Sequence, residues 1–108
     1  MSKKEEGKKH TALRDRVLKN ISAEGFEEEE REIPVVARMR KRTVEILDSL
    51  VTIGVFKSRS EAAAALVEGA ITSKEELFED IRKQAVDLEE RKESAMKQAQ
   101  ETILGKLK

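Results

Sequence analysis

The spacing of apolar residues changes at Arg40, and this change limits the folds open to the chain. Before Arg40 alternate residues share a face, as they do in a β-strand. One face holds Val35, Ala37 and Met39, and the other holds Pro34, Val36, Arg38 and Arg40. No second segment has this pattern. Because a lone strand leaves its backbone donors and acceptors unpaired, we expect it to pair with another copy of the chain or with another protein.

Beyond Arg40 the apolar residues recur at steps of three and four, which predicts a first helix. Gly54 follows the last of them and is suited to the left-handed conformation that ends many helices. The apolar positions of this helix are Val44, Leu47, Leu50 and Val51.

Ser58 and Glu61 have the spacing of a capping box, which predicts that a second helix begins there. One face of this helix carries residues suited to close packing, namely Ala62, Ala65, Leu66 and Gly69. A third and longer helix is expected from residues 72–73 toward Leu104. Its apolar stripe is thin and is interrupted by Lys92, so it does not by itself predict a coiled coil.

The composition excludes several classes of function. The chain has no Cys, one His, no Trp and no Tyr, so a disulfide framework, a thiol nucleophile and a Cys/His metal cluster are ruled out. Three Phe side chains make a stacking platform for single-stranded nucleic acid a poor expectation. We therefore expect no enzyme activity, no cofactor and no metal site. The sequence has no apolar run of membrane-spanning length and no secretory signal, so we expect a cytoplasmic, nucleoid-associated protein.

The charges are segregated although 22 basic and 22 acidic residues balance. Residues 22–32 contain six Glu and one Arg, whereas residues 33–59 contain six basic and two acidic side chains. We expect residues 1–32 to form a flexible charged arm, in which the helical spacing of its few apolar residues allows a short helix over 11–21. Residues 33–71 then form the main domain, and residues 72–108 a C-terminal helical extension.

This order of elements resembles the ribbon-helix-helix family of DNA-binding proteins. The segment VARMRKRTVEILDSL is similar to the family's strand and first helix, and FKSRSEAAAAL is similar to the opening of its second helix. The resemblance covers residues 33–71. It implies a mostly α-helical homodimer in which two strands, one from each copy, pair antiparallel. Here a long C-terminal helix would be added to that fold.

The resemblance also implies which residues would contact DNA and which would form the dimer. The paired strands would enter the major groove with Pro34, Val36 and Arg38 toward the bases, and of these only Arg38 can donate hydrogen bonds to a base edge. Contacts to the DNA backbone would come from Arg40, Lys41, Arg42, Lys57, Ser58 and Arg59. The dimer core would contain Val35, Ala37, Met39, Val44, Leu47 and Leu50.

The function expected on this basis is that of a transcription regulator that binds double-stranded DNA as a homodimer or a higher oligomer. The competing interpretation of the basic cluster is an ordinary solvated surface. The alternative function is a protein-interaction module of the antitoxin type, with the C-terminal helix binding a partner protein and little or no specific recognition of DNA.

Overall fold

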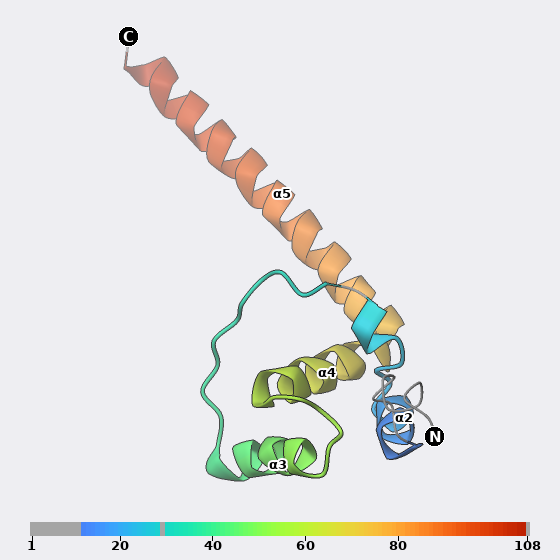
Figure 1. Cartoon of the computed structure of the whole chain (residues 1–108). Coiled ribbons are helices and arrows are strands. Elements are labelled where there is room, and N and C mark those ends of the chain that lie inside the picture. The colour runs from blue at the N-terminus through green and yellow to red at the C-terminus, as the bar shows by residue number, and fades with distance from the viewer. Residues whose placement is uncertain (1–11, 29, 108) are drawn as a thin grey trace. The chain divides into compact units, whose positions relative to one another are not determined.

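A computed structural model describes residues 12–28 and 30–107 of the chain. Residues 1–11 and 29 of the expected flexible arm lie outside the described residues. Four α-helices and a short 3-10 helix follow one another in the described part (Figure 1): α2 Ala12–Asn20, η1 Phe26–Glu28, α3 Lys41–Thr52, α4 Arg59–Thr72 and α5 Glu75–Lys106. The chain divides into two compact units, Met1–Ser73 and Lys74–Lys108.

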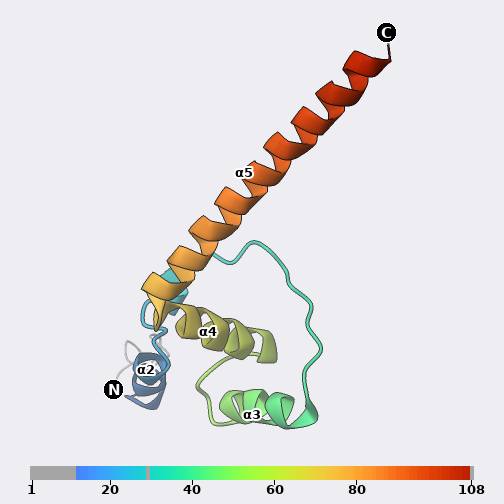
Figure 2. The same ribbon diagram turned by 180° about the vertical axis from the view of Figure 1, so that it is seen from behind.

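The strand expected over residues 33–40 is absent, and the ribbon-helix-helix fold expected from it is wrong for this structure. Residues 30–40 form an extended segment without helix or strand, and no β-strand occurs among the described residues. Figures 1 and 2 show this segment running from η1 to the start of α3. The reason is that alternation of apolar and polar residues favours an extended backbone but supplies no neighbour. A strand needs a hydrogen-bonded partner strand, and the described part of the chain offers none.

Helix α3 begins after Arg40, whose backbone is extended and whose side chain makes no capping hydrogen bond. The helix ends as the sequence predicts: Gly54 adopts a φ of +88°, where a Cβ would be strained. The backbone N–H of Val55 then donates to the carbonyl oxygen of Leu50 at 2.9 Å. This turn directs Val55 and Phe56 into the interior, where both are buried.

Helix α4 begins with the predicted cap. The Ser58 hydroxyl oxygen accepts a hydrogen bond from the Glu61 backbone N–H at 3.1 Å, an interaction that contributes about 1 kcal/mol in helices of this kind. The predicted small-residue face is confirmed, since Ala62, Ala65 and Gly69 are buried. Helix α3 packs against α4.

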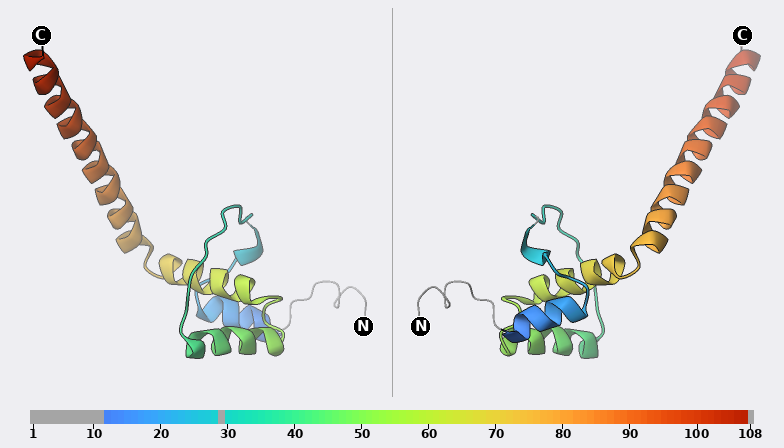
Figure 3. Two further views of the ribbon diagram at one scale, coloured as in Figure 1. Left: turned by 90° about the vertical axis from the view of Figure 1, so that its left-hand side faces the viewer. Right: turned by 90° about the vertical axis from the view of Figure 1, so that its right-hand side faces the viewer.

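The core of the first unit is completed by residues from the N-terminal arm. Figure 3 shows α2 beside the α3–α4 pair, and Leu18 of α2 joins the buried cluster. The ring of Phe26 in η1 meets that of Phe56 edge to face, with centroids 6.2 Å apart. Residues 12–28 are therefore built into the fold of this unit. The whole cluster contains Leu18, Ala23, Phe26, Leu47, Val55, Phe56, Ala62 and Ala65.

The second unit is the single helix α5, which has no buried residue. Acidic side chains occupy its first turn and Lys106 its last turn, an arrangement that suits the helix dipole. Each helix in the described part of the chain is too short or too polar to cross a lipid bilayer.

Candidate nucleic-acid interface

Four basic side chains lie together in sequence where the extended segment joins α3. Arg38 and Arg40 belong to the segment, and Lys41 and Arg42 begin the helix; all four are exposed. Within the described part of the chain, no carboxylate lies at ion-pair distance from any of them. Other arginines are paired with acidic side chains, namely Arg14, Arg31, Arg59, Arg82 and Arg91. We refer to residues 38, 40, 41 and 42 as the basic segment.

The start of α4 holds the second group of expected backbone contacts. Here two backbone N–H groups already have partners from the chain: the carboxylate of Glu61 accepts from the Lys57 backbone N–H, just before the helix, at 2.8 Å, and the Ser58 oxygen accepts from the Glu61 backbone N–H. A carboxylate thus occupies part of the space in which an anion would bind to this helix terminus. The side chains of Lys57, Ser58 and Arg59 are exposed, and the Ser58 hydroxyl keeps its O–H as a donor.

Arg59 is held by an exposed carboxylate of α3. Its Nε and Nη2 atoms donate to the two carboxylate oxygens of Asp48, both at 3.0 Å. These hydrogen bonds lower the pKa of the Asp48 carboxyl from its ordinary value of 3.8, and the same bonds raise the pKa of Arg59. The fork-to-fork geometry fixes the guanidinium plane at the surface.

The basic segment and the start of α4 adjoin different points along α3. Asp48, which holds Arg59, is seven residues from Lys41, and at the rise of an α-helix this corresponds to about 10 Å along the axis. The structure therefore places the basic segment and the α4 start on the same unit but about two helical turns apart.

An open hollow of about 1360 Å³ lies between the extended segment and the α3–α4 pair. Val35, Ala37 and Met39 line it, whereas Val36 and Arg38 do not, so the alternation predicted from the sequence separates these residues onto two faces. Pro34, expected with Val36 and Arg38, lies on the hollow side. The same hollow is bordered by four polar side chains at the start of α4, namely Lys57, Arg59, Ser60 and Glu61.

The residues expected in a dimer core differ in burial. Leu47 is buried, and Val44 and Leu50 are partly buried, because the core of the chain itself covers that face of α3. Those of the extended segment, Val35, Ala37 and Met39, are exposed. Two residues beside them are also strongly exposed: Ile33 at 83% and Val36 at 95%. A surface with this much apolar area in one short segment is typical of an interface.

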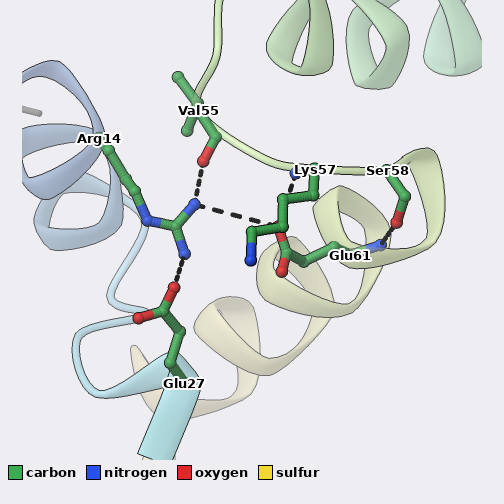
Figure 4. A network of polar contacts seen from close by, with 6 residues as sticks. All are labelled: Arg14, Glu27, Val55, Lys57, Ser58 and Glu61. Atoms are coloured by element: carbon green, nitrogen blue, oxygen red, sulfur yellow. Dashed lines mark hydrogen bonds and ion pairs between the residues drawn. The ribbon is translucent and has the colours of Figure 1, made fainter. Parts of the chain in front are cut away.

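Arg14 was not singled out by the sequence analysis, yet it organises the turn before α4 (Figure 4). It is 4% exposed, and its guanidinium donates to the Val55 carbonyl oxygen and to the Glu27 carboxylate. The Glu61 carboxylate lies 3.9 Å away. A buried guanidinium with these partners ties α2 and η1 to the turn that carries Lys57 and Ser58.

A second arginine joins the extended segment to α4. Arg31 donates to both oxygens of Glu68, with Nη2 at 2.5 Å from Oε1, and its guanidinium carbon lies 3.7 Å from the centroid of the Phe26 ring. This cation–π contact and ion pair anchor the start of the segment. No sequence pattern marked either arginine, because their partners are distant along the chain.

Comparison of the chain with protein family models, with curated proteins and with solved structures finds no match. No group of three or more potential metal-ligating side chains occurs in the part of the chain that was described. The function is therefore inferred from the chain's own residues.

Proposed function

We propose that this chain is a double-stranded DNA-binding protein that contacts the phosphate backbone through the basic segment, Arg38, Arg40, Lys41 and Arg42. The observation that carries the proposal is that these four side chains are exposed and close together in sequence and have no carboxylate partner among the described residues, whereas five of the six other described arginines, all but Arg16, are paired. Unpaired, clustered cations favour a polyanion because their binding releases condensed counterions.

The start of α4 adds a second set of phosphate contacts. Lys57 and Arg59 supply charge, and the Ser58 hydroxyl can donate a hydrogen bond while its oxygen caps the helix. The pair with Asp48 is exposed, and exposed ion pairs contribute little to stability, so a phosphate can replace the carboxylate as the partner of Arg59.

Recognition of sequence falls to the face of the extended segment that points away from the hollow. Arg38 can donate to the acceptor atoms of guanine, and Val36 can contact a thymine methyl group. The residue between them, Ala37, lies on the opposite face and lines the hollow. Because this face offers few donors, most of the affinity comes from phosphates and the sequence preference is modest.

The protein acts as a homodimer in this proposal. The apolar side chains of Ile33, Val35 and Met39 are exposed and line the hollow on the side of the extended segment away from Val36 and Arg38. A second copy that covers this apolar surface forms an isologous interface.

The second candidate is the protein-interaction module of the antitoxin type. One observation favours it: α5 is 32 residues long and buries none of them, so it is free to bind another protein. In that case duplex DNA would bind weakly, and substitutions in the basic segment would have little effect on function.

The test compares two pairs of adjacent basic residues. We expect Arg40→Ala with Lys41→Ala to weaken binding to any duplex by about tenfold or more, since two phosphate contacts are lost from each copy. The matched control is Arg82→Ala with Lys83→Ala, which removes the same charge from α5 and should change affinity little. Equal losses in the two variants would show that net charge alone governs binding and would overturn the proposed site.

A further inference from the structure

One face of α5 carries a stripe of side chains that is symmetric about Lys92. Displacements of four, seven and eleven residues all return to the same face of a helix. At each of these distances, the residues on either side of Lys92 are alike in size and character. The pairs are Leu88 and Met96, Ala85 and Ala99, and Ile81 and Ile103.

The apolar members of this stripe are exposed. Leu88 is 58% exposed, and no residue of α5 is buried by any other part of the described chain. A helix of 32 residues is about 48 Å long, so the stripe is a long, narrow apolar surface. Extended exposed apolar surfaces mark sites of association.

The charges of α5 determine which direction a partner helix would take. The first sixteen residues of the helix, Glu75–Glu90, contain seven acidic and two basic side chains, and the last sixteen, Arg91–Lys106, contain four basic and two acidic. The helix dipole accounts for such a bias only in the terminal turns, yet here the acidic excess continues to Glu90. Two copies side by side in the same direction would place like charges together, whereas opposite directions place acidic beside basic halves.

We infer that α5 pairs antiparallel with α5 of a second copy of this chain, with the twofold axis at Lys92. A helix whose stripe is symmetric presents the same stripe when its direction is reversed. Each residue of the stripe therefore lies opposite a residue of similar size in the second copy. Ile81 meets the partner's Ile103, and Leu88 meets the partner's Met96. Such an interface is isologous and closes as a dimer.

Lys92 at the axis fits this arrangement. Its aliphatic stem continues the apolar stripe while the ammonium group reaches the edge. Glu89 and Glu93, three residues before Lys92 and one after it, lie on the same flank of the stripe. An antiparallel pair brings four carboxylates to the region of the axis, and their charge compensates that of the two ammonium groups.

This pairing goes beyond DNA binding and does not depend on it. The test uses spin labels on the full chain, without DNA, at single cysteines introduced as Glu90→Cys or Glu101→Cys. The natural chain has no Cys, so each label is unique, and both positions lie away from the stripe. With the axis at Lys92, the two labels of a pair are offset along the helices by about 6 Å at position 90 and about 27 Å at position 101.

We therefore expect a clearly shorter label-to-label distance at position 90 than at position 101. Equal distances at the two positions would indicate parallel helices and would overturn the inference. The absence of any measurable interaction between labels on two copies would also overturn the inference. The stripe would then be a binding surface for a different protein.

Two substitutions test whether the stripe causes the short label-to-label distance at position 90. Leu88→Glu, combined with the label at position 90, should abolish the short distance because it places a carboxylate in the interface. Val86→Glu is the matched control, since Val86 is also exposed, at 46%, but lies on another face of α5; it should leave the distance unchanged. The helix content of both variants, measured by circular dichroism, should equal that of the natural chain, so that a lost distance reports the interface and not unfolding. Persistence of the short distance in Leu88→Glu would contradict the assigned face.

Discussion

Arg59 and Asp48 form an ion pair whose strength is set by geometry and limited by exposure. Both oxygens of the carboxylate accept from the guanidinium at 3.0 Å, and both side chains remain in contact with solvent. The pair therefore positions Arg59 at the surface more than it stabilises the fold. This position matters to the proposed function because the same guanidinium is a candidate phosphate contact.

The first prediction concerns the titration of Asp48. Arg59→Ala removes the hydrogen bonds that favour the ionised carboxylate, so the pKa of Asp48 should rise toward its ordinary value of 3.8. A lowered pKa in the folded state stabilises the fold above pH 3.8, and this contribution disappears as the pH falls through the lowered value. The difference in unfolding free energy between the natural chain and Arg59→Ala should therefore narrow below about pH 4.

NMR titration of the Asp48 carboxyl carbon checks this expectation. The matched control is Arg82→Ala, which should raise the pKa of its own partner Glu79 and leave Asp48 unchanged. An Asp48 pKa that is the same with and without Arg59 would show that the pair does not persist in solution.

For individual residues, the sequence predicts contacts only between residues that are close along the chain. The Ser58–Glu61 cap could be predicted because its two residues are three apart and the bond is local. Arg14 could not be identified, since Glu27 and Val55 lie 13 and 41 residues away. A charged residue beside a short apolar pattern normally indicates a solvated surface, and only the packing of η1 and the α4 turn shows otherwise.

At the scale of elements, the approach of the N-terminal arm to α4 depends on one missing side chain. A Cβ built on Gly69 would overlap the carbonyl oxygen of Ile21 and would contact the side chain of Ala23 at 3.5 Å. The chain that follows α2 can lie against α4 only because Gly69 leaves this space open. The backbone N–H of Ala23 donates to the Leu18 carbonyl oxygen at 2.8 Å, which holds this stretch rigid.

The second prediction follows from that contact. Gly69→Ala should lower the unfolding free energy by about 1–3 kcal/mol, because backbone atoms must move to admit the methyl group and this cost exceeds the gain in helix propensity. Gly105→Ala is the matched control, since nothing lies within 4 Å of its Cβ position; it should leave stability unchanged or raise it. Thermal unfolding of the two variants measures both effects. A Gly69→Ala variant with the same unfolding free energy as the natural chain would contradict the packing of residues 21–23 against α4.

The helices could be predicted from the sequence, whereas the strand that the sequence predicts is absent from the described residues. Helical periodicity, the cap at Ser58 and the stop at Gly54 are local signals, and α3, α4 and α5 follow them. The alternation around Val36 correctly separates two faces of the extended segment but says nothing about a neighbour. The hollow could not be predicted either, because it requires the relative placement of the segment and two helices.

For the whole molecule, a net charge of zero conceals an uneven distribution. Arg14 and Arg31 neutralise carboxylates within the first unit, which leaves the basic segment as a local excess of positive charge. A local excess of this kind attracts a polyanion even when the protein as a whole is neutral. DNA binding by such a surface has a measurable signature, which is its dependence on salt.

The most direct measurement of the central claim is therefore a titration of the full chain with duplex DNA at several salt concentrations. If six to eight phosphates are neutralised by each homodimer, the logarithm of the affinity should fall against the logarithm of salt with a slope of roughly −5 to −7. Arg38→Ala should preserve most of this slope but reduce the preference among sequences, by about 1–3 kcal/mol if the contact is bidentate. Undetectable binding at low salt, or an affinity that does not change with salt, would contradict the account.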